Sequence, residues 1–318
     1  MPVFADRPVP ARRRPRTFRL WVVGLAVLAT GMAAQANSEL GVRVPEGFEV
    51  TLFAGDELAH DIYSMTVDAR GRVVVSGAGY VRILIDKDGD GRADDVRQFV
   101  DGPATGAQGM FFHGRDLLCS GDGGLIRYRD RNGDDRADGP PDVFIKAQTG
   151  GEHDIHAIRK GPDGWWYMIA GNFSGVDASY ISLPTSPVKN PQAGTVLRLK
   201  PDLSGGEIVC DGFRNAYDFD FGAAGDLFSF DSDGERDISL PWYRPTRVFH
   251  LVPGGHVGWF STSWKRPGSY MDMPPVTGAF GRGSPTGVEC YRHTQFPEQF
   301  QGALFVLDWT YGRVFALP

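Results

Sequence analysis

Residues 64–100 read SMTVDARGRVVVSGAGYVRILIDKDGDGRADDVRQFV, and this stretch decides the fold. Apolar and β-branched residues recur at 64–68, 72–76, 81–85 and 96–100, and short segments rich in glycine or aspartate separate these runs. Runs of this length and composition, bounded by turn residues, predict strands. The stretch therefore predicts a single antiparallel sheet built from consecutive strands.

The same pattern recurs along the rest of the chain. A second unit starts at residue 109, and acidic loops at Asp86 and Asp130 mark equivalent positions 44 residues apart. Further units begin near residues 156, 217 and 287. A unit of four strands that repeats every ~40 to 50 residues is typical of a β-propeller blade.

We therefore expect an all-β protein, a β-propeller of the six-bladed type in which this chain supplies five blades. Residues 48–53 read as a strand without a blade of its own. We expect this strand to complete the last blade, because an open sheet edge would recruit another chain. The sixth blade is expected beyond residue 318, and residues 252–284 predict no clear strand.

Composition and charge exclude several classes of protein. The chain has 318 residues, of which 42% are hydrophobic and 23% charged, so it is neither disordered nor fibrous. The net charge is −6, and the arginines concentrate in residues 1–36, so the rest of the chain is still more acidic. An acidic body repels phosphate backbones, which argues against nucleic acid as a partner. The three cysteines support no disulfide framework, and no haem-attachment motif is present.

The first 36 residues predict a cleavable signal peptide. A basic region precedes an apolar run at 20–32, and Ala34-Gln35-Ala36 follows as a cleavage site. A retained membrane anchor is the alternative, although the run is shorter than the ~20 residues that a spanning helix needs. We expect a linker at 37–46, the propeller at 47–318, and an exported protein in the periplasm or at the cell surface.

Two acidic loops predict calcium sites, since alternate carboxylates on a tight turn direct their oxygens at one hard cation. The flanking segments are strands, so these would be hairpin loops that stabilise the fold and take no part in catalysis. A solvated acidic turn without metal is the alternative for each loop. The expected calcium ligands are Asp86, Asp88, Asp90 and Asp94 in the first loop, and Asp130, Asn132, Asp134 and Asp138 in the second.

Other polar motifs precede the innermost strands of the third and fourth blades. Glu152 and His153 stand before the third blade, and Arg214 and Asn215 stand before the fourth. Segments that enter innermost strands meet at one mouth of the propeller channel, so we expect these residues to gather there. Asp231 and Asp233 follow in a loop that either holds a calcium ion at the mouth or is a solvated loop tip.

These motifs resemble a known family. Glu152-His153, Gly161-Pro162-Asp163-Gly164, Phe213-Arg214-Asn215 and Gly254-Gly255-His256-Val257-Gly258-Trp259 are similar to motifs of the soluble quinoprotein glucose/sorbosone dehydrogenase superfamily. Val44-Pro45-Glu46-Gly47-Phe48 and Leu307-Asp308-Trp309-Thr310-Tyr311-Gly312-Arg313 look more like the membrane-bound dehydrogenase propellers of large exported bacterial proteins. The resemblance covers residues 44–318, and only the combination of motifs is specific.

The resemblance implies a dehydrogenase that oxidises a sugar or related alcohol with pyrroloquinoline quinone (PQQ) and Ca²⁺. It implies that His153 is the general base, that Arg214 stabilises the developing oxyanion, and that a cytochrome c domain of a longer protein accepts the electrons. Departures from the family are Ala216 in place of a proline and Thr310 near the position of a cofactor-binding lysine. The cofactor-binding residues implied in this way are Glu152, Arg214, Asn215 and Gln108.

Two other functions compete with this interpretation. One is a calcium-dependent hydrolase of the lactonase type, in which a central calcium polarises a carbonyl group. The other is a non-catalytic propeller that binds glycans or proteins at its channel face. The lactonase interpretation would place the calcium between Glu152, Asn172, Asn215 and Asp231.

Overall fold

The computed structural model describes residues 34–37, 40–261, 264–271 and 273–318, which divide into two units at Glu46/Gly47. In the first unit β1 (Ala34–Asn37) pairs antiparallel with β2 (Val42–Pro45). Most of the expected signal peptide lies outside the described residues, and the segment expected to be a linker contains β2 instead. Within the described ranges, no helix has the length and hydropathy of a membrane-spanning segment.

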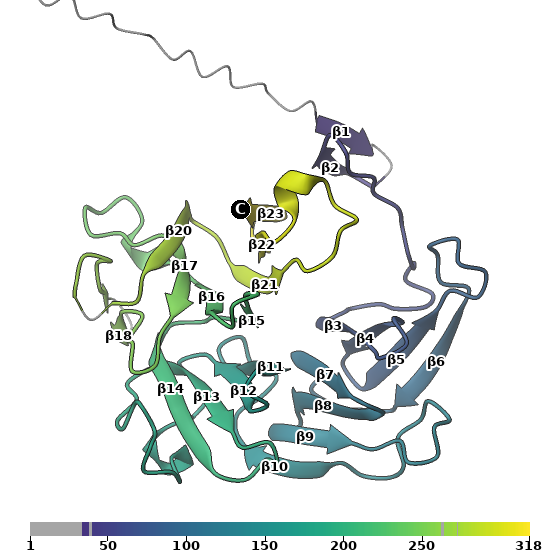
Figure 1. The fold of residues 1–318 in the computed structure, drawn as a ribbon, viewed down its shortest axis with the longest axis horizontal. Helices are drawn as coiled ribbons and strands as arrows, with labels where there is room; N and C mark the ends of the chain where they lie inside the picture. Colours follow the sequence, from purple (N-terminus) through teal and green to yellow (C-terminus); the bar gives the residue numbers. More distant parts are fainter. Residues whose placement is uncertain (1–33, 38–39, 262–263, 272) are drawn as a thin grey trace, which may run out of the picture. The chain divides into compact units, whose positions relative to one another are not determined.

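The second unit is a five-bladed β-propeller, which confirms the expected fold class. The blades follow one another around a centre in chain order (Figure 1). In each of the first three blades the strands pair in sequence order. These blades consist of β3 (Ser64–Val67), β4 (Val73–Gly77), β5 (Tyr80–Ile85) and β6 (Asp95–Val100); β7 (Gly109–His113), β8 (Asp116–Gly121), β9 (Gly124–Tyr128) and β10 (Asp142–Lys146); and β11 (Ile155–Lys160), β12 (Trp166–Ala170), β13 (Gly194–Leu199) and β14 (Gly206–Phe213).

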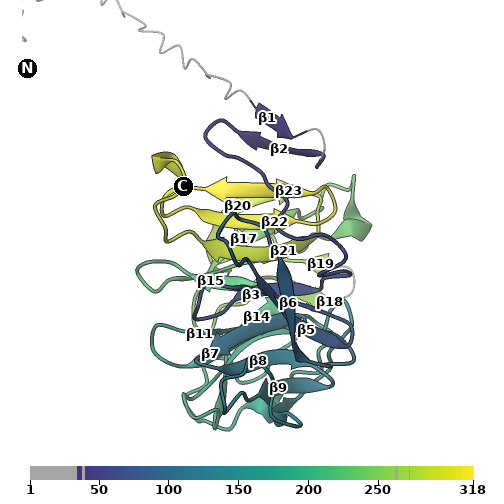
Figure 2. The ribbon, with the colours of Figure 1, turned by 90° about the vertical axis from the view of Figure 1, so that its right-hand side faces the viewer.

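The last two blades depart from this regular order. The outermost strand of the fourth blade comes from the stretch in which the sequence predicts no clear strand, and the same stretch forms a separate hairpin. The fifth sheet has three strands, which lie side by side in Figure 2. The fourth blade consists of β15 (Phe219–Phe221), β16 (Leu227–Asp231), β17 (Thr246–Leu251) and β20 (Val276–Gly281), the hairpin of β18 (Trp259–Ser261) and β19 (Trp264–Lys265), and the fifth blade of β21 (Pro285–Cys290), β22 (Leu304–Asp308) and β23 (Arg313–Leu317).

Residues 48–53, expected to be a strand of the last blade, are not assigned to a strand, and the fifth sheet is formed by β21, β22 and β23 without them. Phe48 packs on Phe296 of the fifth blade at a ring-centroid distance of 4.8 Å. The carbonyl of Phe53 accepts a hydrogen bond from the Ala93 N–H, as the carbonyl of Phe99 on β6 accepts one from the Ala137 N–H. Phe53 therefore contacts the first acidic loop in the same way that Phe99, on the outermost strand β6, contacts the second acidic loop.

The core lies between neighbouring blades, because most blade strands bury both faces. Val74 and Ile83 of the first blade pack against Leu117 and Ile126 of the second, and all four are almost fully buried. Cys119 lies in the same cluster, and burial raises the pKa of its thiol. All three cysteines are free and buried, so they pack as small apolar side chains.

Two outward sheet faces remain exposed. On β3 of the first blade, Met65 and Val67 are 67% and 55% exposed. On the fifth blade, Val314 of β23 is 64% exposed, and its register partner Leu307 on β22 is 37% exposed. These apolar side chains lie on the faces that turn away from the second and fourth blades respectively.

Candidate functional site

A cavity of about 650 Å³ lies where the segments entering the third and fourth blades meet. Glu152 and His153 come from the loop before β11, Arg214 follows β14, and Trp259 lies on β18. The short 3-10 helix η2 (Glu235–Asp237) closes another side. A smaller adjoining cavity of about 190 Å³ shares Glu152 and Arg214 and adds Asn215 and Arg282. The structure therefore brings together the four residues that the sequence places at the channel mouth.

His153 is fixed at the cavity wall. Its ring is 7% exposed and stacks on Phe173 at a centroid distance of 5.0 Å. Its Nδ1 donates to the side-chain oxygen of Asn172 over 2.6 Å, so Nε2 is the unprotonated nitrogen of the neutral ring. Nε2 lies 3.9 Å from a carboxylate oxygen of the exposed Glu152. A Cβ at Gly171 would lie 2.5 Å from the His153 carbonyl, which explains the glycine before Asn172.

Gln108 holds the loop that carries His153. Its side-chain amide donates to the Gly151 carbonyl over 3.0 Å, and its side-chain oxygen accepts from the Gly150 N–H over 3.2 Å. Gly150 has φ +89°, a value that favours glycine. Gln108, expected to contact a cofactor, lines neither cavity, and its polar atoms position the loop that carries His153.

His156 is a structural histidine. It is fully buried, its Nε2 donates to the Asn215 side-chain oxygen over 3.0 Å, and its ring stacks on Tyr217. Burial lowers the pKa of this imidazole to about 4, so the ring is neutral at physiological pH. His156 therefore fixes the amide of Asn215, and His153 is the histidine that faces the cavity.

Arg214 is held at both ends. Its backbone N–H donates to both carboxylate oxygens of Asp231 over 3.2 Å, and the N–H of Asn215 donates to the same carboxylate over 2.9 Å. Its guanidinium donates to Ser232 and Glu235 and lies 5.5 Å above the ring of Trp259. Arg214 therefore presents a fixed positive charge at the wall between the two cavities.

Asp231, expected as a calcium ligand at the mouth, pairs with a lysine in this structure. Its side chain is 0% exposed and forms an ion pair with Lys265 over 2.8 Å. Burial would raise the pKa of Asp231, but Lys265 and the two backbone N–H groups lower it below its ordinary value. Burial lowers the pKa of Lys265 to about 8 against the opposing effect of Asp231. The lactonase interpretation places its calcium at this same carboxylate, which here is occupied by the ammonium group of Lys265.

Asp233 is also placed differently from the expectation. It is 3% exposed and accepts a hydrogen bond from the Tyr243 hydroxyl over 2.6 Å. Burial raises the pKa of its carboxyl group. Among the described residues, neither Asp231 nor Asp233 belongs to a cluster of carboxylates that could hold a metal ion.

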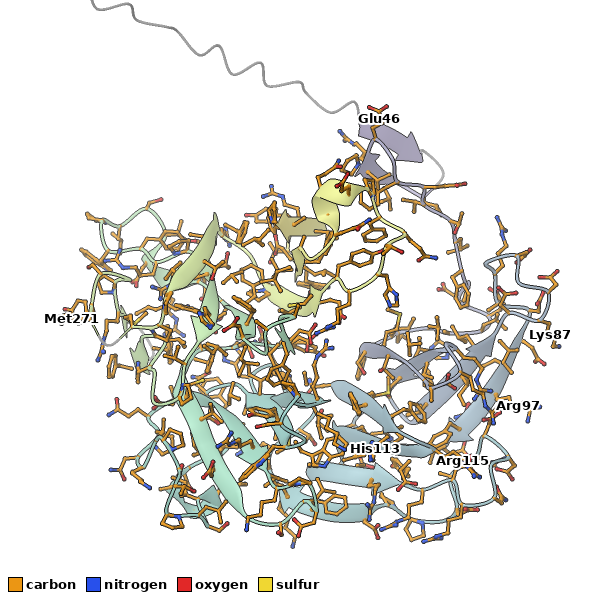
Figure 3. All side chains as sticks on the ribbon, viewed as in Figure 1. Glu46, Lys87, Arg97, His113, Arg115 and Met271 are labelled. Carbon is orange, nitrogen blue, oxygen red and sulfur yellow. The ribbon has the colours of Figure 1, made fainter. Side chains whose placement is uncertain are left out.

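The first acidic loop does bring carboxylates together. Oxygens of Asp86, Asp88 and Asp94 all lie within 4.8 Å of one another, and the loop lies at the outer edge of the first blade, where Figure 3 labels Lys87. Asp90 lies outside this group and accepts the Arg92 N–H. Backbone N–H groups, that of Gly91 first, lower the pKa of Asp86. Three of the four expected calcium ligands are therefore close enough together to bind one ion.

The second acidic loop repeats the backbone contacts of the first. Asp130 accepts the N–H groups of Gly133 and Asp135, as Asp86 accepts those of Gly89 and Gly91. Its remaining expected ligands take part in similar loop contacts, because Asn132 and Asp134 bond to each other and Asp138 accepts the Arg131 N–H. No group of three acidic side chains is found here in the part of the chain that the structure describes.

Sequence reasoning missed several residues of the site. Lys265 and Trp259 lie on a hairpin in a stretch without predicted strands, and nothing local indicates that Lys265 reaches Asp231. Arg236 and Arg282 are exposed at the cavities, but isolated surface arginines carry no sequence signal. Their positions follow only from the blade geometry.

Comparisons with known proteins agree with the fold. The model of a family described as "Domain of unknown function (DUF7133)" matches residues 34–312. No curated protein matches the sequence. The PQQ-bound aldose sugar dehydrogenase of Streptomyces coelicolor superposes with a TM-score of 0.57 and 15% identity, covering 81% of this chain and 77% of that one.

Two further solved structures are similar to a comparable extent. An oxidoreductase described as a glucose dehydrogenase, from Thermus thermophilus, has a TM-score of 0.55 and 18% identity, covering 84% of this chain and 82% of that one. The PQQ domain of a pyranose dehydrogenase from Coprinopsis cinerea has a TM-score of 0.55 and 13% identity, with 78% and 70% covered. At this identity the likeness establishes a shared propeller fold.

Proposed function

We propose that this chain, which belongs to the DUF7133 family, is the propeller of an exported dehydrogenase that oxidises a hydroxyl group of a sugar or related alcohol with PQQ. The observation that carries the proposal is His153, which lines a cavity of about 650 Å³ together with Arg214 and whose Nδ1 is engaged by Asn172, so that Nε2 is left for a substrate. A cavity of this size is in the range of sites that take up cofactors and small substrates.

The residues present suit a flat, anionic quinone. Trp259 and Phe173 offer aromatic surfaces, and Arg214, Arg236 and Arg282 offer positive charge for carboxylates at the two cavities. Glu152 and Glu235 are the exposed or half-buried acidic groups there, and the buried Asp154, Asp237 and Asp233 also line the two cavities. Asn215, expected to contact the cofactor, lines the smaller cavity and keeps its amide oriented through His156.

The protein's own part in the reaction is proton transfer and orientation. Nε2 of His153 accepts the proton of the substrate hydroxyl, because Asn172 fixes the tautomer in which this nitrogen is free. The charge of Arg214 stabilises the oxyanion that develops during the reaction. PQQ, when bound, would accept the hydride that leaves the carbon bearing the hydroxyl group.

Export and a downstream cytochrome c acceptor are part of the same proposal and rest on the sequence. The basic and apolar segments before residue 37 support export. The acceptor follows from the family resemblance and would take the electrons from the reduced cofactor.

The test is reduction of an artificial dye by the purified protein, with PQQ and Ca²⁺ added and a panel of aldoses and simple alcohols supplied. We expect substrate-dependent reduction that requires PQQ. Quenching of tryptophan fluorescence by PQQ serves as a separate measure of binding. Absence of both quenching and reduction contradicts the proposal. Binding of glycans without any turnover would instead support the non-catalytic alternative.

A second expectation concerns the acidic loops. We propose that the first loop binds Ca²⁺ through Asp86, Asp88 and Asp94, because a shared cation neutralises the repulsion between their neighbouring carboxylates. At a calcium concentration of about 100 times the dissociation constant, binding adds roughly 2.7 kcal/mol to the free energy of unfolding. The melting temperature should rise with added Ca²⁺ and fall with chelator. The double variant Asp86→Asn/Asp88→Asn should lose this response, while the exposed Asp56→Asn should keep it; an unchanged response in the double variant contradicts the proposal.

A further inference from the structure

The β18–β19 hairpin carries a buried positive charge into the wall of the site. Lys265 is 2% exposed, and its Nζ forms an ion pair with Asp231 over 2.8 Å and also donates to the Ser232 carbonyl. In the hairpin Lys265 is the register partner of Trp259, which lines the cavity. The same short element therefore supplies an aromatic wall and a buried ammonium group.

The carboxylate of Asp231 connects this ammonium to the main chain of two site residues. It accepts the N–H groups of Arg214 and Asn215, so Lys265 acts on both through one side chain. Ser232 provides a second connection, because its carbonyl accepts from Lys265 and its hydroxyl accepts from the Arg214 guanidinium over 3.1 Å. The backbone and the guanidinium of Arg214 are thus both linked to Lys265.

Lys265 is not the only buried cation near this carboxylate. Arg247 is also buried on the adjoining strand, but its guanidinium donates to the carbonyls of Arg266 and Val257. A buried carboxylate requires a counter-charge, since an unpaired charge away from water is very costly. Lys265 supplies it through an ion pair over 2.8 Å, and the charge of Arg247, the register partner of Asp231, adds to it.

We propose that Lys265 is the permanent counter-cation of the channel mouth and positions Arg214 and Asn215, so that this part of the site needs no metal ion. A divalent ion would have to displace an ammonium group that is tethered to the chain and already satisfies the carboxylate. The proposal does not depend on the dehydrogenase reaction. Lys265 is a positioning residue, because it acts through Asp231.

The first experiment removes the ammonium group of Lys265 by mutation and then adds a small alkylammonium ion to the solution to replace it. In Lys265→Ala we expect the melting temperature to fall by roughly 10 °C, as for the loss of one partner of a buried ion pair. Ethylammonium chloride should recover part of this loss, whereas tetramethylammonium chloride, CaCl₂ and NaCl at equal ionic strength should not. The exposed Lys146→Ala is the matched control and should melt like the unchanged protein.

The second experiment reports on the position of Arg214. The fluorescence of Trp259 is obtained by subtracting the emission of the Trp259→Phe variant from that of the same protein with Trp259 present. The wavelength of this emission should shift in Lys265→Ala and should return to its original value when ethylammonium is added, because Trp259 lies beside the Arg214 guanidinium. If Lys265→Ala does not fold, Lys265→Met/Asp231→Asn should fold, because neither charge remains. Three results would overturn the proposal. The first is a recovery of the melting temperature by Ca²⁺ equal to that by ethylammonium, and the second is a Trp259 signal that changes when chelator is added to the unchanged protein. The third is a melting temperature that Lys265→Ala does not change. All readouts are independent of turnover, so failure of the dehydrogenase proposal is distinguished from failure of this one.

Discussion

Replacing His153 by glutamine is expected to lower the turnover of a sugar or alcohol substrate by about two to four orders of magnitude, the usual contribution of a positioned general base. Glutamine retains the size and a donor toward Asn172, but it has no basic nitrogen to take the hydroxyl proton. The measurement is the steady-state rate of dye reduction with PQQ present. Quenching of protein fluorescence by PQQ should be retained, because the loss concerns proton transfer.

The control for this variant is His113→Gln. His113, labelled in Figure 3, is exposed on β7 and lines neither cavity. Its replacement should leave turnover within twofold. If His153→Gln also turns over within twofold of the unchanged protein, His153 is not the base, and the assignment of the reacting centre to this cavity is wrong.

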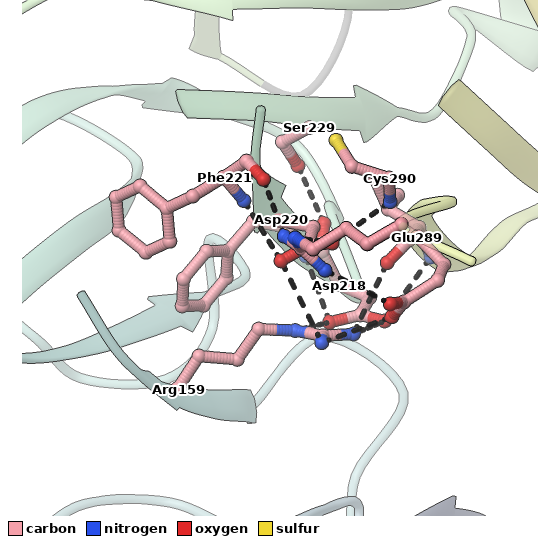
Figure 4. A network of polar contacts seen from close by, with 10 residues as sticks. Arg159, Asp218, Asp220, Phe221, Ser229, Glu289 and Cys290 are labelled. Atoms are coloured by element: carbon pink, nitrogen blue, oxygen red, sulfur yellow. Dashed lines mark hydrogen bonds and ion pairs between the residues drawn. The ribbon is translucent and has the colours of Figure 1, made fainter. Parts of the chain in front are cut away.

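Replacing Arg159 by methionine is expected to lower the free energy of unfolding by about 2 to 3 kcal/mol, because the half-buried carboxylate of Asp218 loses its charge-assisted hydrogen bonds. Arg159 on β11 forms ion pairs with Asp218 over 3.0 Å and with Glu289 over 3.1 Å (Figure 4). It also donates to the Val288 carbonyl over 3.1 Å. One side chain of the third blade thus connects the fourth and the fifth.

Urea denaturation measures this effect directly. The exposed Arg115→Met is the matched control and should change the free energy of unfolding by no more than about 0.5 kcal/mol. The double variant Arg159→Met/Glu289→Gln should be less destabilised than the sum of its single variants, since the carboxylate left unpaired is then removed. A loss below about 1 kcal/mol in Arg159→Met would contradict the prediction.

The blades could be predicted because their signals are local. Alternating apolar runs and glycine turns predict strands within a few residues, and the repeated acidic loops fix the period. The convergence of His153 and Arg214 also followed from the sequence, because both precede the innermost strand of a blade and such positions meet at one mouth. Residues that precede the innermost strands of neighbouring blades therefore lie close together in the fold.

The contacts that complete the site could not be predicted in this way. Lys265 and Asp231 are 34 residues apart, and the hairpin that joins them lies in a segment without strand periodicity. Asp231 reads as a calcium ligand because its loop is acidic, and only the fold shows that an ammonium group already neutralises it. Likewise, Asp135 of the second acidic loop pairs with Arg72 of another blade, a contact that no local pattern encodes.

The exposed apolar residues of β3 and of β22 and β23 have a consequence for how copies of this chain would meet. The two faces differ, because Met65 and Val67 form one and Leu307 and Val314 the other. Pairing between unlike faces is heterologous, so each contact leaves a free face at either end. Self-association of this chain through these two faces would therefore be head-to-tail, and the rotation between neighbouring copies would decide between a closed ring and an open filament.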